Sequence, residues 1–187
     1  MRSLSGKITI AINSSNMLLA DALKIAIEAR EILRPHCERV EIAGSIRRNK
    51  PEVGDIEIVA IPLPYETGLF ESGIATVVNQ WTKVKGELEY IGRPKIKKCK
   101  YTQRILPSGM VLDLFFAEPE NWGYIYAIRT GSVEYSKTLA QRWNQLGYHG
   151  DEGYLWRTGG HIVTVREEED LFNLLKIPFC PPGARNL

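Results

Sequence analysis

The spacing of apolar residues divides the chain into helical and strand-like segments. From Leu18 to Leu33 apolar residues recur at helical spacing, after a polar Ser15–Asn16 that can cap a helix and before the helix-breaking Pro35. The following pattern predicts strands over 39–44 and 54–61, a short helix beginning at 45–49, a helix over 69–81, and strands over 101–106 and 110–117. Pro107-Ser108-Gly109 predicts a hairpin turn between the last two strands.

After Pro119 the pattern becomes mainly helical. The predicted elements there are helices over 122–129 and 132–146, a hairpin of strands 154–157 and 161–163 around Gly159-Gly160, and a helix over 167–175. Thr164 followed by Glu167 predicts a capping box for the last helix, and the acidic residues near its start suit the helix dipole. We therefore expect a domain boundary near Pro119, which separates residues 1–118 from residues 119–187.

Two carboxylates stand two residues apart in the predicted strand over 54–61. Alternation along a strand places Asp55 and Glu57 on one face, where they can share divalent metal. Just upstream, Gly44–Arg48 reads Gly-Ser-Ile-Arg-Arg and offers backbone amides, a hydroxyl and guanidinium groups, which suit a nucleoside triphosphate. Gly44 and Gly54 allow a close approach of backbone to phosphate. This short stretch thus predicts both halves of a nucleotidyl-transfer site.

A third carboxylate, Asp113, lies inside the apolar strand Val111–Phe116. A carboxylate half-buried among apolar neighbours is costly unless it is paired or binds a metal ion. Taken alone, Asp113 is equally compatible with a solvated sheet face or a salt bridge to a nearby Arg or Lys. The preceding Gly-Asp-x-Glu motif favours the metal-binding interpretation.

The segment 44–57 resembles the signature of the family X DNA polymerases, within the nucleotidyltransferase superfamily related to DNA polymerase beta. Val111–Phe115 looks like the family strand that carries a third carboxylate, and Thr130-Gly131-Ser132 looks like the tripeptide that opens its thumb. The segment from Tyr148 through 178–182 is also similar to the end of that thumb. The resemblance covers roughly residues 39 to 187. It implies an α+β fold, with a nucleotidyltransferase palm of mixed or antiparallel sheet flanked by helices, followed by a small α/β thumb.

The resemblance also implies roles for individual residues. Asp55 and Glu57 would bridge two Mg²⁺ ions, for which Mn²⁺ can substitute, and Asp113 would bind the ion that activates the primer 3′-hydroxyl. The expected nucleotide-binding residues are Gly44, Ser45, Arg48, Gly54, Arg129, Thr130 and Gly131. For Arg47 a structural salt bridge and a ligand role remain equally open.

Three positions depart from the family pattern. Glu57 stands where Asp is usual, and it lengthens the metal ligand by one methylene. Ile128 and Arg129 replace the Tyr-Phe pair that packs against the incoming sugar and base, so sugar discrimination is open. Arg129 is compatible with a contact to phosphate, base edge or template, or with the helix end alone. Val111 replaces an arginine that is common near the catalytic carboxylate.

The formal net charge is only +2, but basic residues gather in one segment. Between Arg93 and Arg104 there are basic side chains and no acidic one. The candidate nucleic-acid contacts are Lys98, Lys100, Arg104 and, on the predicted helix over 132–146, Lys137. The alternative is that Lys98, Lys100, Thr102 and Arg104 form the solvated face of a strand.

The cysteine spacing and the distribution of apolar residues exclude several classes of protein. Cys37, Cys99 and Cys180 lack the spacing of a zinc site or a disulfide framework. The sequence has neither a run of about 18 apolar residues nor a charged-then-apolar leader, so we expect no membrane partner. We expect a cytoplasmic monomer, associated with the nucleoid or with viral replication if it is of phage or viral origin.

Three functions remain in competition. The first is a gap-filling repair polymerase that adds dNTPs to gapped or primer-template DNA with release of pyrophosphate. The second is a template-independent nucleotidyltransferase that uses another acceptor. The third is a non-catalytic nucleic-acid-binding protein that kept the fold, which the presence of all three carboxylates argues against.

Overall fold

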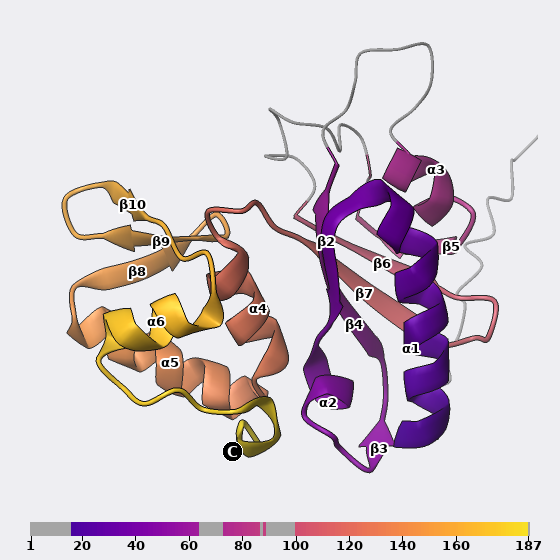
Figure 1. Cartoon of the computed structure of the whole chain (residues 1–187), viewed down its shortest axis with the longest axis horizontal. Helices are drawn as coiled ribbons and strands as arrows, with labels where there is room; N and C mark the ends of the chain where they lie inside the picture. The colour runs from indigo at the N-terminus through magenta and orange to yellow at the C-terminus, as the bar shows by residue number, and fades with distance from the viewer. Residues whose placement is uncertain (1–15, 64–72, 87, 89–99, 187) are drawn as a thin grey trace, which may run out of the picture.

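The computed structural model describes residues 16–63, 73–86, 88 and 100–186. They form two lobes (Figure 1). The N-terminal lobe contains β1 (Met17–Leu18), α1 (Leu19–Leu33), η1 (Arg34–His36), β2 (Cys37–Ile42), α2 (Gly44–Arg47), β3 (Glu52–Val53), β4 (Ile56–Pro62), α3 (Gly73–Val78), β5 (Thr82–Lys85), β6 (Tyr101–Ile105) and β7 (Val111–Phe116). The C-terminal lobe contains α4 (Trp122–Thr130), α5 (Val133–Gln145), β8 (Tyr148–Asp151), β9 (Tyr154–Arg157), β10 (His161–Val163), α6 (Glu168–Leu175) and η3 (Pro182–Ala184).

The N-terminal lobe is organised around a five-stranded sheet in the order β2-β4-β7-β6-β5. Strands β4 and β7 run parallel, and the other neighbouring strands run antiparallel, so the sheet is mixed. The predicted α+β class with a mixed sheet is confirmed. The parallel pair requires a long crossover between β4 and β7, which brings residues about fifty positions apart in sequence side by side.

Alternation along the strands separates a core face from a site face. On β4, Ile56, Ile58 and Ala60 are buried in the cluster that contains α1 and α3. α1 covers this face of the sheet (Figure 1). Side chains one position along each strand, such as Glu57 and Asp113, therefore lie on the opposite face. We call that opposite face the site face.

The C-terminal lobe has its own core and also packs on the site face. Its core joins α4, α5, α6 and β9 through Leu139, Trp143, Leu155 and Leu171. A separate buried cluster joins the two lobes, made of Ala43, Val59, Ile61, Phe115 and Ala117 with Trp122 and Tyr126 of α4. The aromatic residues Trp122, Tyr124 and Tyr126 are thus core residues, because all three are buried. Helix α4 consequently has a fixed position against the sheet.

The sequence located the main elements but missed several details. Strands β5 and β8 were not predicted. The predicted helix over 69–81 ends at Val78, and residues 69–72 lie outside the described residues. The capping box of α6 uses Glu167 as N-cap with Asp170, three residues later than the predicted Thr164 with Glu167. None of the helices in the described part of the chain has the length and apolar character needed to cross a membrane.

Candidate active site between the lobes

Helix α2 begins at a glycine that lies directly against a carboxylate. Gly44 has φ +61°, and a Cβ added there would lie 1.9 Å from Glu57 Oε2. The backbone amide of Ala43 donates to the carbonyl of Glu57 at 2.8 Å. A side chain at position 44 would be strained by its backbone angle and would displace the Glu57 carboxylate. The turn expected to bind phosphate and the strand expected to bind metal therefore contact each other.

The three predicted carboxylates converge at one end of the site face. Glu57 and Asp113 are register partners on the parallel strands β4 and β7, and Asp55 immediately precedes β4. Desolvation, followed by the charge of Asp113, raises the pKa of Asp55. Desolvation and the charges of Asp55 and Asp113 raise the pKa of Glu57 to about 7, in spite of Arg129 and Arg48. This cluster therefore carries more negative charge than its neighbours neutralise.

The donor set fits a hard divalent cation that also binds substrate. No group of three His, Cys, Asp and Glu side chains with metal-binding geometry is found within residues 16–63, 73–86, 88 and 100–186. Mg²⁺ commonly binds through one or two carboxylates together with substrate phosphates and water, so a closed protein cage is not required. The carboxylates of Asp55, Glu57 and Asp113 provide the charge and the oxygen atoms that such a cation needs.

Two predicted phosphate-binding residues lie next to the carboxylates. The Ser45 hydroxyl is buried and has no hydrogen-bond partner in the described structure. Arg48 is only 8% exposed; its Nη1 donates to the Thr130 carbonyl at 2.7 Å and its Nε to Asn186 Oδ1 at 2.8 Å. Desolvation lowers the pKa of Arg48, and the charges of Glu57 and Asp55 oppose this effect. Arg48 therefore links the carboxylate cluster to the C-terminal lobe.

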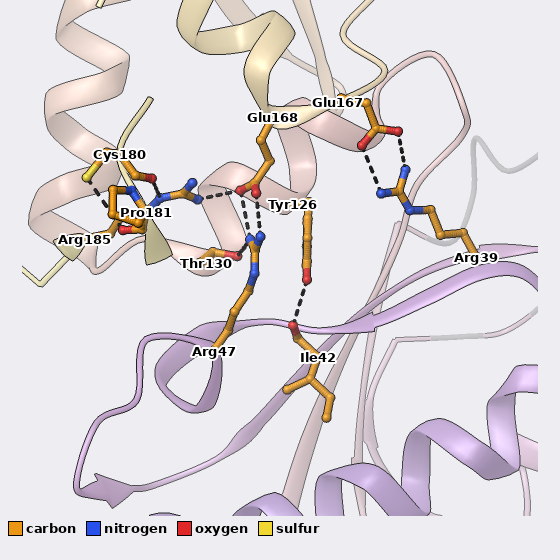
Figure 2. A network of polar contacts seen from close by, with 10 residues as sticks. All are labelled: Arg39, Ile42, Arg47, Tyr126, Thr130, Glu167, Glu168, Cys180, Pro181 and Arg185. Atoms are coloured by element: carbon orange, nitrogen blue, oxygen red, sulfur yellow. Dashed lines mark hydrogen bonds and ion pairs between the residues drawn. The ribbon is translucent and has the colours of Figure 1, made fainter. Parts of the chain in front are cut away.

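Arg47 belongs to a buried ionic network between the lobes (Figure 2). Its guanidinium binds both carboxylate oxygens of Glu168, at 2.9 and 2.6 Å, and donates to Thr130 Oγ1 at 2.7 Å. Glu168 also accepts from the fully buried Arg185 at 2.5 Å. Burial alone would raise the pKa of Glu168, but the hydrogen bonds from Arg47 and Arg185 lower it overall. The open question for Arg47 is thus answered by a structural ion pair in this network.

Thr130 also lies in this network. It is fully buried, its hydroxyl accepts from Arg47 and its carbonyl accepts from Arg48. Thr130 therefore takes part in the contact between the lobes through both its hydroxyl and its carbonyl, and the predicted nucleotide contact at this residue stays a prediction. Arg39 adds an ion pair with Glu167 at 2.6 Å, also between the lobes (Figure 2).

An open cleft of about 630 Å³ leads from the C-terminal lobe to Glu57. Among the residues that line it are Glu57, Arg129, Gly131, Val133, Ser136 and Lys137. The guanidinium carbon of Arg129 lies 4.0 Å from the centre of the Phe115 ring. Desolvation lowers the pKa of Arg129, while the charges of Glu57 and Asp113 raise it. Arg129 is therefore the cation that the C-terminal lobe presents to the carboxylates.

The remaining predicted nucleotide contacts differ in their surroundings. At Gly131, a Cβ would meet Tyr135 and Ser136 side-chain atoms at 2.8 and 2.9 Å, so the glycine keeps the start of α5 compact beside the cleft. At Gly54 a Cβ would meet only Asn16 Oδ1, at 3.4 Å. Sterics in this structure therefore explain Gly131 and Gly44, whereas Gly54 has room for a side chain.

The predicted basic track is only partly exposed. Arg104 is 1% exposed and Thr102 is fully buried, so the interpretation of both as members of a solvated or DNA-binding face is wrong. Their side chains point to the core face, because Tyr101 and Gln103 occupy the site face of β6. Lys100 is exposed, and Lys98 lies outside the described residues. Lys137 is exposed, pairs with Glu134 at 2.9 Å and lines the cleft.

Several residues at the site were missed by the sequence analysis. Tyr101 and Gln103 hydrogen bond to Asp113, and Glu168 and Arg185 complete the network around Arg47. Gln103 gave only a weak signal for the first pair, because its neighbours Thr102 and Arg104 in the strand are also polar. The second pair had no local signal, because Glu168 lies in an acidic run that a helix start already explains.

Comparisons with known proteins support the architecture. Residues 126–186 match the family model described as the DNA polymerase beta thumb. Among solved structures, polymerase beta of Leishmania infantum in a ternary P/T complex matches at 18% identity with a TM-score of 0.69, over 94% of this chain and 78% of that chain. The ternary gap complex of the same polymerase matches at 17% identity with a TM-score of 0.70, over 94% and 72%. No curated protein sequence matches. The fold of the chain is that of polymerase beta, and its C-terminal lobe matches that polymerase's thumb.

Proposed function

We propose that this chain, with its polymerase beta fold and thumb, transfers a nucleotide from a dNTP to a DNA 3′-hydroxyl and releases pyrophosphate. The preferred substrate in this proposal is gapped DNA, because one of the similar solved structures is a gap complex of a polymerase beta. The thumb match and the fold support a polymerase-type function. The reaction and its substrate are our proposal.

One observation carries the proposal: three carboxylates meet beside a phosphate-binding turn, at the mouth of a cleft. Glu57 is the register partner of Asp113 on the neighbouring strand, and its carboxylate lies against Gly44, the first residue of α2. The turn contributes the buried Ser45 hydroxyl, which a phosphate oxygen can satisfy. An unpartnered buried hydroxyl beside a carboxylate whose pKa is raised in spite of Arg48 and Arg129 is typical of a functional site.

In this proposal, different residues of the site bind the divalent ions, bind the phosphates and assist removal of the proton during in-line phosphoryl transfer. Asp55 and Glu57 would hold the divalent ions, and Asp113 would complete the site beside the attacking hydroxyl and assist its deprotonation. When bound, the cations would neutralise charge on the triphosphate and lower the pKa of the attacking 3′-hydroxyl. Ser45 donates a hydrogen bond to a phosphate oxygen, and Arg48 neutralises charge on the leaving pyrophosphate. Lys137, beside the cleft, is suited to the DNA backbone.

Arg129 favours a second candidate, a template-independent transferase that uses another acceptor. Its guanidinium stacks on Phe115 near the carboxylates, where the family resemblance leads us to expect an aromatic contact to the sugar and base. A cation at this position can bind the phosphate or carboxylate of an acceptor without recognising a base pair. The template requirement therefore separates the two candidates.

Extension of a labelled primer tests both candidates. Each dNTP is supplied singly with Mg²⁺ or Mn²⁺, on duplex DNA with a single-nucleotide gap and on the single-stranded primer. Asp113→Asn is the matched control, because it keeps the shape of the side chain and removes the charge. Addition of only the complementary nucleotide on gapped DNA supports the polymerase. Addition without regard to template supports the second candidate, and no metal-dependent transfer to DNA by the wild type contradicts the proposal of DNA polymerase activity.

A further inference from the structure

Asp113 is held by two neutral donors from the neighbouring strand. Tyr101 Oη donates to Asp113 Oδ1 at 2.7 Å, and Gln103 Nε2 donates to the same oxygen at 2.7 Å. Gln103 is the direct cross-strand partner of Asp113, and Tyr101 lies two residues before it on the same face of β6. Both bonds have ordinary lengths for strong side-chain hydrogen bonds.

Both donors point to one oxygen of the carboxylate. Oδ1 accepts from Tyr101 and from Gln103, and neither of them binds Oδ2. Two donors on one oxygen fix the plane of the carboxylate, because a rotation out of that plane would break both hydrogen bonds, whereas a half-turn only exchanges two equivalent oxygens. The orientation of Oδ2 is therefore set before any substrate binds.

The ring of Tyr101 is itself fixed by packing. It stacks on Phe115 with ring centres 5.0 Å apart and planes at 27°. Phe115 also contacts the guanidinium of Arg129 from the C-terminal lobe. Lys85 Nζ lies 5.6 Å from the centre of the Tyr101 ring. The hydroxyl that contacts Asp113 is thus supported by a stack of side chains that reaches from β5 to α4.

We propose that Tyr101 and Gln103 are positioning residues for Asp113, which hold Oδ1 so that Oδ2 is presented to the divalent ion and to the attacking hydroxyl. This inference rests on the proposed nucleotidyl transfer at the same site. Hydrogen-bond partners of a metal ligand fix its orientation, and their loss typically weakens metal affinity or activity by about 10–100-fold. Tyr101 and Gln103 would orient Asp113 without adding a positive charge beside it. Val111, on the strand of Asp113, has no polar group that could take this role.

Two single variants remove the donors and keep the packing. Tyr101→Phe removes one hydroxyl and leaves the ring that stacks on Phe115. Gln103→Met removes the amide and keeps a side chain of similar length. The matched control is Tyr154→Phe, because the Tyr154 hydroxyl also donates to a carboxylate, that of Glu118, outside the carboxylate cluster.

Two readouts distinguish a positioning role from a structural one. The first is single-nucleotide addition to gapped DNA, measured as kcat and as KM for dNTP. The second is Mn²⁺ affinity, measured from the electron paramagnetic resonance signal of free Mn²⁺ with a non-hydrolysable dNTP analogue and primer-template present. For Tyr101→Phe we expect kcat to fall by about 10–100-fold with KM for dNTP little changed, and Mn²⁺ to bind more weakly. We expect Gln103→Met to act in the same direction and Tyr154→Phe to match the wild type in both readouts.

Wild-type kcat and Mn²⁺ affinity in both Tyr101→Phe and Gln103→Met would overturn the inference while leaving the proposed function intact. A wild-type protein that transfers no nucleotide would contradict the proposed function, and the Mn²⁺ readout would still test the hold on Asp113. Melting temperatures identify a variant that fails to fold. If one of the two variants fails to fold, the other still tests whether a donor to Asp113 affects kcat and Mn²⁺ affinity.

Discussion

Glu57 of the N-terminal lobe and Glu168 of the C-terminal lobe are both largely removed from water, and they differ in the charges that surround them. Glu168 faces two guanidinium groups, of Arg47 and Arg185, which outweigh the effect of burial and lower its pKa. Burial, followed by the charges of Asp55 and Asp113, raises the pKa of Glu57 to about 7. The same side chain is therefore neutralised where it stabilises the assembly of the lobes and left without sufficient counter-charge where a cation is expected.

The comparison of the two glutamates indicates which charges stabilise the fold and which are available to a ligand. In the ion pairs of Glu168, both carboxylate oxygens accept from guanidinium groups of the protein, so the negative charge of Glu168 is neutralised without a ligand. Burial and the charges of Asp55 and Asp113 raise the pKa of Glu57, and at neutral pH a carboxylate in such surroundings reduces the stability of the folded protein until a cation binds. The following predictions test this distinction, from the largest expected effect to the smallest.

Replacement of Asp113 should abolish transfer without loss of the fold. For Asp113→Asn we expect a fall in the rate of nucleotide addition of roughly 10³-fold, since a metal ligand supports several kcal/mol of charge stabilisation in the transition state. The melting temperature should stay at or above that of the wild type, because a source of repulsion is removed. Asp21→Asn, in an exposed pair with Lys24, is the control and should keep full activity. Full activity of Asp113→Asn would exclude Asp113 from the site.

Replacement of Glu168 should produce the opposite result, a large loss of stability. In Glu168→Gln the buried guanidinium of Arg185 loses its counter-charge, and breaking such a pair costs about 3 kcal/mol. Urea unfolding measures this loss, and the exposed pair changed by Asp21→Asn should cost less than about 0.5 kcal/mol. Equal stability of Glu168→Gln and the wild type would mean that the network does not hold the lobes together.

The stability of the metal-free protein should fall as pH rises from about 5 to 8. The folded-state pKa of Glu57 is raised above its unfolded value of 4.5, to about 7. Protonated Glu57 is therefore the favoured folded form, and its contribution is lost as the pH passes through about 7. After allowance for its partial exposure we expect about 2 kcal/mol from this group.

Thermal unfolding in a metal chelator across this pH range measures the effect of Glu57. Glu57→Gln should show a smaller fall than the wild type, since it cannot ionise, and Mg²⁺ with dNTP should restore wild-type stability at high pH. The same dependence on pH in Glu57→Gln would place its source in another group.

Replacement of Arg48 should affect nucleotide binding more than DNA binding. Arg48→Ala removes a charge-assisted contact to phosphate, so we expect KM for dNTP to rise by about tenfold, with DNA affinity changed less than about twofold. Asn186→Ala is the matched control, because it removes the interface partner of Arg48 and leaves the guanidinium in place. An equal loss of both affinities in Arg48→Ala would instead place this residue on the DNA.

The sequence located the carboxylates because their signal is local. Asp55 and Glu57 share a strand face by simple alternation, and Gly44–Arg48 precedes them at a fixed distance. The pairing of Glu57 with Asp113 depends on the parallel contact of β4 and β7. Only the family resemblance, and no local pattern, indicated that contact.

The errors arose where the local pattern was ambiguous. Strand β6 carries polar residues on both faces, so alternation alone could not decide whether Arg104 or Gln103 points to the core. Burial decides it, because Arg104 is 1% exposed on the core face, whereas Gln103 donates to Asp113 on the site face. The ion pair of Arg47 with Glu168 spans 121 residues of sequence, and such pairings follow from the packing of the lobes rather than from either segment.

Single-nucleotide gap filling by Glu57→Gln, measured together with its melting temperature in the absence of metal, tests the central claim most directly. The account predicts opposite signs: transfer falls by roughly 10³-fold, and the metal-free protein at about pH 8 becomes more stable than the wild type. A variant that keeps wild-type transfer, or that loses stability as Glu168→Gln should, would contradict the assignment of the unneutralised carboxylates to catalysis.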